Sequence, residues 1–173
     1  MHLESEVRRT PGRVLGHLLL AFLLLGSAQA RADLFDDPDA VLDALHARAA
    51  AADYDGYFAL YTDDAVFLGT DAGERWPIEE FRRYTQARFA TGTGWTYVPT
   101  ERHLMRAADG DTIWFDEIVV GASMGPCRGT GVLVRTDVGW QIAHYSLTLL
   151  VPNALADEVT ASIRALDADG TTP

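Results

Sequence analysis

The chain has 173 residues, 48% of them hydrophobic, which is enough for one domain with a full core. Its formal net charge is -11, so we expect neither nucleic acid nor an anionic membrane surface as a partner. The single cysteine, Cys127, excludes an internal disulfide framework and a cysteine-rich zinc site, and a small buried side chain is its ordinary role.

Residues 1–30 have the pattern of a secretory signal peptide. Three arginines precede an apolar run at 14–25, and small residues follow that run as far as Ala30. We expect cleavage after Ala30, with Ala32 as the alternative site, and a mature protein that is secreted or periplasmic. The apolar run is short for a membrane span, although an uncleaved anchor is the other interpretation of it. After cleavage we expect no stable contact with a membrane.

A short acidic linker at 31–38 leads into helical periodicity. Asp37 before Pro38 is typical of a helix start, and apolar residues at spacings of three and four predict a helix at 39–52. A short second helix over 57–61 and a short strand over 65–69 are expected next.

The second half of the chain changes period. A third helix is predicted at 76–91, because Pro77 and two acidic residues stand at its start. Beyond it the apolar residues alternate, as they do in strands. The predicted strands are 95–106, 112–120, 126–136 and 140–151. Helices first and antiparallel strands afterwards predict an α+β domain over 39–153, with the helices on one face of the sheet. A C-terminal helix at 154–166 and a disordered tail at 167–173 complete the prediction.

The predicted strand at 112–120 carries two neighbouring acids, Asp116 and Glu117, on opposite faces. Both faces are otherwise mostly apolar, so we expect the strand to be covered on both sides and to lie near the middle of the sheet. A buried carboxylate is costly unless it is paired or protonated, so at least one of these acids requires an explanation. Because they point to opposite sides, they cannot act as one catalytic pair.

Glycines mark one face of the next strand. Gly125, Gly129 and Gly131 share a face with Cys127, and such a row usually indicates a bend or a close approach by backbone or ligand. A strongly curved sheet with a cavity between its concave side and the helices would use them. Glycine bulges that curve the sheet without any ligand are the alternative. The segment is no phosphate loop, because it lacks the lysine and opens no helix.

The histidines of the mature chain do not predict a metal site. His144 shares its strand face with Trp140 and Ile142, and the more apolar face should pack on the helices, so His144 is expected at an interface or the surface. By the same logic His103 is expected to be exposed. Together with His46 they lack the spacing of metal ligands, so we expect no metal and no cofactor.

The order helix, helix, short strand, helix and four long strands resembles the nuclear transport factor 2-like fold. Within it, the residues resemble the SnoaL-like domain family. The matching segments are YFALYTDDAVF at 57–67, ERW at 74–76, GWTY at 94–97, WFDE at 114–117, RGTGVL at 128–133 and GWQIA at 139–143. The resemblance covers about 41–153 and implies a cone, in which N-terminal helices pack on a strongly curved, mainly antiparallel sheet around an apolar pocket. It also implies a homodimer made through the outer sheet face.

The resemblance suggests roles for the two acids. Glu117 is the candidate for the pocket, where burial would raise its pKa and let it act as an acid, a base or a hydrogen-bond donor. Asp116 is the second catalytic candidate and is expected on the outer face. A structural pair with a buried arginine, such as Arg75 or Arg128, is the alternative role for Glu117.

The remaining pocket candidates are aromatic residues and one arginine. They are Trp76, Tyr84, Trp95, Tyr97 and Arg128, in addition to Glu117. Aromatic residues at these spacings also suit a plain core.

Three functions follow as hypotheses. The first is an exported domain that binds a small apolar or amphipathic organic molecule. The second is an enzyme with the same pocket that carries out acid/base isomerisation or dehydration through Glu117 or Asp116. The third is a dimerising interaction module without a ligand. The fold alone does not decide between these three functions, because proteins that share it include isomerases, cyclases and dehydratases.

Overall fold

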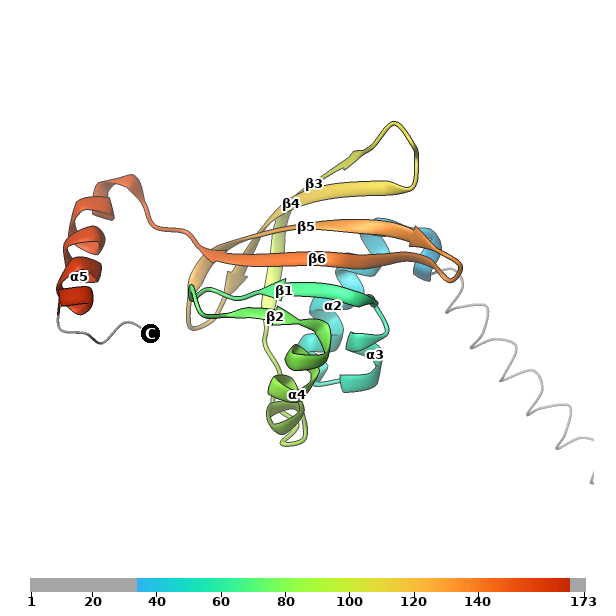
Figure 1. Ribbon diagram of the computed structural model, residues 1–173, viewed down its shortest axis with the longest axis horizontal. Helices are drawn as coiled ribbons and strands as arrows, with labels where there is room; N and C mark the ends of the chain where they lie inside the picture. The colour runs from blue at the N-terminus through green and yellow to red at the C-terminus, as the bar shows by residue number, and fades with distance from the viewer. Residues whose placement is uncertain (1–33, 169–173) are drawn as a thin grey trace, which may run out of the picture.

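A computed structural model describes residues 34–168, so the predicted signal peptide and the end of the predicted tail lie outside the described residues. The helices are α2 (Pro38–Ala51), α3 (Tyr54–Phe58), α4 (Ile78–Phe89), a 3-10 turn η1 (Asn153–Leu155) and α5 (Ala156–Ala168). The strands are β1 (Tyr61–Leu68), β2 (Arg75–Pro77), β3 (Tyr97–Arg106), β4 (Thr112–Gly121), β5 (Gly125–Thr136) and β6 (Gly139–Leu149). Figure 1 shows α2, α3 and α4 gathered on one side of a curved sheet.

The strands described form one six-stranded sheet in the order β2-β1-β6-β5-β4-β3. Three consecutive hairpins join β3 to β6, so these strands pair antiparallel. β1 pairs with β6 in parallel. The two are separated along the chain by β2, α4 and the strands β3 to β5, and this pair makes the sheet mixed. The predicted α+β class, with helices packed on a curved and mainly antiparallel sheet, is confirmed.

The core lies between the concave side of the sheet and the helices. In α2 the buried side chains follow the helical stripe of Val41, Leu42, Leu45, His46 and Ala49. The helix starts as predicted, with the carboxylate of Asp37 accepting a hydrogen bond from the backbone N–H of Asp39 at 3.0 Å.

The segment after α2 differs from the prediction. The second helix begins earlier, at Tyr54, because the side chain of Asp53 accepts a hydrogen bond from the N–H of Gly56 and caps it. β1 begins earlier too, since Tyr61 already pairs with Ile142 of β6. The residues around Trp76 form β2 rather than the first turn of the third helix, because they pair with β1.

A bulge in β6 changes which residues of this strand face the core. Val132 of β5 is opposite His144, but Leu133 is opposite Ile142, so Ala143 is an extra residue. The alternation therefore slips at this point, and Trp140, Ile142 and Tyr145 are all buried. The predicted single faces for the whole strand were wrong, although His144 does lie half-buried on the outer face.

The expectation that β4 is covered on both sides was also wrong for the described chain. β4 is the strand next to the edge strand β3. Its inner residues are buried, but Trp114 and Val120 on its outer face are 46% and 42% exposed. The helices pack on the concave side only, and the outer face of the sheet is open.

Beyond β6, the last element of the described residues is α5, which Figure 1 shows standing clear of the sheet. Its side chains are almost all exposed. None of the helices within residues 34–168 combines the length and the apolar composition that crossing a membrane requires.

Candidate functional site

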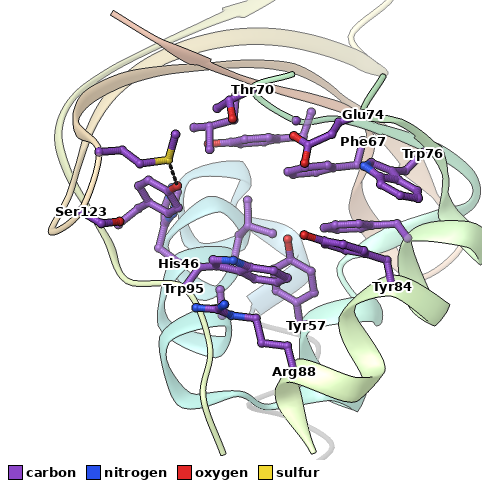
Figure 2. A pocket seen from close by; sticks show the side chains of 18 residues that line it. His46, Tyr57, Phe67, Thr70, Glu74, Trp76, Tyr84, Arg88, Trp95 and Ser123 are labelled. Atoms are coloured by element: carbon purple, nitrogen blue, oxygen red, sulfur yellow. Dashed lines mark hydrogen bonds between the residues drawn. The ribbon is translucent and has the colours of Figure 1, made fainter. Parts of the chain in front are cut away.

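A cavity of about 320 Å³ opens between the concave side of the sheet and the helices α2 and α4. Figure 2 shows Phe67, Glu74 and Trp76 on one side of the central space and Trp95, Tyr57 and Tyr84 on the other. The full lining is Leu45, His46, Ala49, Tyr57, Phe67, Gly69, Thr70, Glu74, Trp76, Phe81, Tyr84, Arg88, Trp95, Tyr97, Ser123, Met124, Tyr145 and Leu147.

Several aromatic rings of the cavity wall lie nearly parallel to a neighbouring ring, while Tyr57 is inclined at 60° to Phe81. Phe67 and Phe81 stack with centroids 4.1 Å apart and planes 5° apart. Tyr84 and Trp95 lie 6.4 Å apart at 10°. Phe67 and Tyr145 lie 5.8 Å apart at 4°. Nearly parallel, offset rings are a favourable arrangement of aromatic side chains.

Local features hold two of the aromatic residues of the wall, Trp76 and Trp95. Trp76 of β2 is positioned by its antiparallel pairing with Phe67 of β1. Trp95 is brought to α2 by a hydrogen bond from its backbone N–H to the carbonyl of Ala49, 3.2 Å long. Gly94 makes this approach possible, because a Cβ at that position would collide with the same carbonyl. The predicted wall residues Trp76, Tyr84, Trp95 and Tyr97 all line the cavity.

Glu117 lies behind the cavity wall and has no exposed surface. Its Oε1 accepts a hydrogen bond from the hydroxyl of Tyr145 and lies 2.8 Å from Nε2 of His46. Its Oε2 accepts a hydrogen bond from Nε of Arg102 at 2.9 Å. These hydrogen bonds satisfy the buried carboxylate and offset the free-energy cost of removing it from water.

The charges around Glu117 determine its protonation. Burial by itself raises the pKa of Glu117, but the hydrogen bond and charge of His46 and the guanidinium of Arg102 outweigh burial and leave that pKa below its ordinary value. The expected raised pKa was therefore wrong. Burial and the negative charge of Glu117 raise the pKa of Tyr145 well above its ordinary value, so this phenol stays protonated and donates.

Arg102 connects the buried acid to the surface of α2. Its Nη1 donates to Oδ1 of Asp39 at 2.9 Å and to Oδ1 of Asp43 at 2.8 Å. Burial tends to lower the pKa of Arg102, but these carboxylates and Glu117 raise it overall. One guanidinium thus ties β3 and α2 to β4 through three acids.

Two of the sequence-based assignments around Glu117 need correction. The buried arginine beside it is Arg102, and neither Arg75 nor Arg128 contacts it. Arg128 is exposed and opposite Ile118 on the outer face, so it does not line the cavity. Asp116 is likewise on the outer face, where its side chain is 42% exposed and lies 3.4 Å from Nδ1 of His103. Asp116 is thus on the far side of the sheet from the cavity.

Two residues that sequence reasoning missed carry the contact between Glu117 and the cavity. Glu117 does not line the cavity itself, but His46 and Tyr145 do. His46 stands four residues after Leu42 on the apolar stripe of α2, a signal of burial that could have identified it. The alternation of the strand puts Tyr145 on the more apolar face, which was expected to pack on the helices, but its hydrogen bond to Glu117 depends on the register of the sheet.

Glycine in β5 makes room for this cluster. Gly129 is opposite both Glu117 and Leu147 in the sheet. A Cβ on Gly129 would collide with the hydroxyl of Tyr145 and approach Cγ of Glu117 to 3.0 Å. The glycine-rich face predicted for β5 therefore lies, at Gly129, against the cluster of Glu117 and Tyr145.

The other candidate groups lie outside the cavity. Cys127 is fully buried, and burial raises the pKa of its thiol. His103 is exposed on the outer face. Within the described residues, no group of three or more His, Cys, Asp or Glu side chains is arranged to hold a metal ion.

The chain is similar to several solved structures. A nuclear transport factor 2-like protein of unknown function from Pseudomonas putida has a TM-score of 0.55 at 15% identity, covering 65% of this chain and 84% of that one. A proposed aromatic ring hydroxylase from Novosphingobium aromaticivorans has a TM-score of 0.53 at 22% identity, with coverages of 65% and 85%. A proposed dehydratase from Streptomyces avermitilis has a TM-score of 0.54 at 15% identity, with coverages of 65% and 92%.

At these identities the solved structures establish the fold and not an activity. A search among curated proteins found no match. The model of the SnoaL-like domain matches residues 39–152, which is most of the chain. The chain therefore belongs to the SnoaL-like domain family, and it has the nuclear transport factor 2-like fold.

Proposed function

We propose that this protein binds a flat, largely apolar organic molecule in the cavity between its sheet and its helices. The observation that carries the proposal is the set of near-parallel ring faces on the cavity walls. The volume of about 320 Å³ is at the lower end of the range for small-molecule sites, so the guest is a compact molecule of a few rings.

A few polar groups interrupt the apolar wall. His46, Tyr145, Glu74 and Arg88 supply them. Arg88 is also held in place, because it lies 5.1 Å from the ring centroid of Trp95 and donates to the carbonyl of Gly94. A mostly apolar wall with few convergent polar groups favours an amphipathic ligand over a purely hydrocarbon one.

The test uses naphthalene and 2-naphthol as flat aromatic probes, with affinity measured by calorimetry. Tyr84→Ala removes a wall ring that is already 50% exposed, so this variant should fold. We expect it to weaken binding by about tenfold. The matched control is Trp114→Ala on the outer face, which should bind like the wild type. Absence of binding by both probes, or equal losses in both variants, would contradict the proposal.

A second candidate function is acid/base chemistry on the bound molecule. The observation that favours it is the contact between Glu117 and His46, because His46 also lines the cavity. A proton shuttle that depends on Glu117 predicts that Glu117→Gln abolishes turnover of a substrate while the affinity for naphthalene is retained. Retained turnover in that variant would exclude this role for Glu117.

We also propose that the protein is a homodimer formed through the outer face of the sheet. Trp114 and Val120 of β4 and Val98 of β3 are large apolar side chains left exposed on that face. Polar residues such as Thr130 of β5 and Ser146 of β6 lie on the neighbouring strands of the same face, and interfaces between subunits commonly have such a mixture.

Export is the last part of the proposal. It rests on the charge and apolar pattern of residues 1–30, which lie outside the described residues. Mass spectrometry of the protein recovered from the periplasm or the medium should find a chain that begins at Arg31. A chain that keeps Met1 and stays in the membrane fraction would support the uncleaved anchor.

A further inference from the structure

Glu74 presents to the cavity a carboxylate with one oxygen unpaired. It stands in the loop between β1 and β2 and lines the cavity. Its Oε2 accepts a hydrogen bond from the backbone N–H of Asp71 at 3.2 Å. Among the described residues, no second donor reaches this carboxylate and no cation pairs with it. Figure 2 shows the side chain of Glu74 turned toward the central space, so Oε1 is able to accept a hydrogen bond from a bound molecule.

The hairpin of β1 and β2 holds this carboxylate in place. The backbone N–H of Gly69 donates to the carbonyl of Glu74 at 2.8 Å, and the N–H of Glu74 donates to the carbonyl of Asp71 at 3.0 Å. The side chain of Glu74 lies against Gly69, where an added Cβ would collide with Oε2. A side chain that is already fixed loses less conformational entropy when a ligand binds, so this carboxylate is suited to binding.

Aromatic ring faces accompany the carboxylate on the cavity wall. Trp76 follows Glu74 by two residues, and its ring stacks on Tyr84 with centroids 4.9 Å apart. Phe67 is opposite Trp76 in the sheet and stands on the same side of the cavity as Glu74 (Figure 2). The face of an aromatic ring is its electron-rich side and attracts a cation. A carboxylate beside such rings gives this part of the wall the character of a site for an organic cation.

The basic groups of the wall leave the charge of Glu74 without compensation. Arg88 lies with its guanidinium carbon 5.1 Å from the ring centroid of Trp95, and its Nη2 donates to a backbone carbonyl at 3.0 Å. Figure 2 shows this guanidinium on the far side of Trp95 from Glu74. The Nε2 of His46 is directed at Glu117. The chain as a whole has a net charge of -11, which attracts cations and repels anions.

We infer that the bound molecule carries a positive charge: a protonated amine on a flat apolar body, held by Glu74 and by the ring faces beside it. This inference rests on the proposed binding function and adds the chemical class of the ligand. A neutral molecule of the same shape would displace water from Glu74 without replacing its hydrogen bond, which weakens binding. An anion would meet the carboxylate directly and bind least. Glu74 is a binding residue in this arrangement and takes no part in a reaction.

Three probes of one shape test the charge of the ligand: 2-naphthylmethylamine, 2-naphthylmethanol and 2-naphthoic acid, titrated by calorimetry into the intact protein at neutral pH. We expect the amine to bind about tenfold more tightly than the alcohol, and the acid to bind more weakly than either. In Glu74→Gln the amine and the alcohol should bind equally, and an unchanged affinity for the alcohol shows that the cavity is intact. Glu80→Gln changes the net charge by the same amount at an exposed position of α4 and should keep the preference.

Equal affinities of the amine and the alcohol in the wild type would overturn the inference while leaving the binding function intact. The same loss of preference in both variants would also overturn it, because the overall charge would then account for the effect. Failure of all three probes to bind would contradict the binding function as well.

A second measurement follows Glu74 itself. Carbon NMR of protein labelled at the glutamate carboxyl groups identifies the Glu74 signal as the one that is missing from Glu74→Gln. This signal should shift when the amine is added and move less with the alcohol. A Glu74 signal that stays in place at saturating amine would contradict the inference.

Discussion

Glu117 is a charged side chain without exposed surface, and three partners on three different elements hold it. His46 comes from α2, Arg102 from β3 and Tyr145 from β6. Removing one member of such a cluster leaves a buried charge without its partner, and this commonly lowers the free energy of unfolding by about 3–5 kcal/mol. The neighbouring Asp116, one residue away in sequence, lies on the solvent side and has no such role.

This contrast gives a prediction at the residue scale. Glu117→Gln should lower the free energy of unfolding at pH 7 by about 2 kcal/mol or more, because it removes a charge that Arg102 faces. Asp116→Asn should change the same quantity by less than about 0.5 kcal/mol. Urea unfolding followed by tryptophan fluorescence measures both, and similar losses in the two variants would show that the buried cluster contributes no special stability.

The pH dependence of the wild type follows from the same group. The folded pKa of Glu117 is lowered, so its contribution to stability is complete above its ordinary pKa and is lost as the pH falls through the folded value. The difference in unfolding free energy between wild type and Glu117→Gln should therefore shrink when both are measured at about pH 3 instead of pH 7. A difference that grows at low pH would mean that Glu117 is protonated in the native protein.

At the scale of single elements, β5 and β6 shape the site. The bulge at Ala143 lets Ile142 and Tyr145 both face the core, and the missing side chain at Gly129 leaves room for the hydrogen bond from Tyr145 to Glu117. A strand with a side chain at position 129 would keep its pairing with β4 but would have no room for this hydrogen bond.

Gly129→Ala should accordingly displace Tyr145 and destabilise the fold by about 2 kcal/mol, as an overpacked core position does. Gly73→Ala is the control, because there the nearest group to an added Cβ is the flexible side chain of Asp71 at 3.3 Å. Thermal unfolding of the two variants compares them. Equal melting temperatures for Gly129→Ala and the wild type would show that β5 is not tightly packed against the cluster.

The sequence predicts the elements of this fold well because their signals are local. Helical stripes and strand alternation depend on neighbours along the chain, and they place α2, α4 and the four long strands to within a few residues. The aromatic residues predicted for the cavity wall, among them Trp76 and Trp95, do line it, since large rings are usually placed where they can be at least partly buried.

The polar cluster is less accessible from the sequence. Arg102 is opposite Glu117 only because β3 and β4 pair in one particular register, and a shift between Pro99 and Glu101 interrupts that register. Trp140 and Ile142 face the core together with Tyr145 only because of a bulge that no sequence period announces. Contacts between distant strands depend on register, so they need the structure.

For the whole molecule, the two faces of the sheet differ. The concave face is covered by helices and holds the cavity, whereas the convex face leaves Trp114, Val120 and Val98 exposed. Exposed apolar side chains gathered on one face usually mark a contact with another protein, and a second copy is the partner proposed above.

Trp114→Glu should weaken the proposed homodimer by about tenfold or more, because it buries a charge at the centre of an apolar contact. Val138→Glu, in the turn between β5 and β6, is exposed to a similar degree and should leave assembly unchanged. Sedimentation velocity over a range of concentrations measures both. A wild type that remains monomeric at high concentration would contradict the dimer.

The central claim is that flat aromatic molecules bind between the ring walls of the cavity, and the four tryptophans allow a direct test. Trp76 and Trp95 line the cavity, while Trp114 lies on the outer face and Trp140 is buried in the core. Titration with 2-naphthol, followed through the four indole N–H signals in nitrogen–proton NMR spectra, should shift the signals of Trp76 and Trp95. The signals of Trp114 and Trp140 should stay in place. Shifts confined to Trp114, or no shifts at saturating probe, would contradict the account.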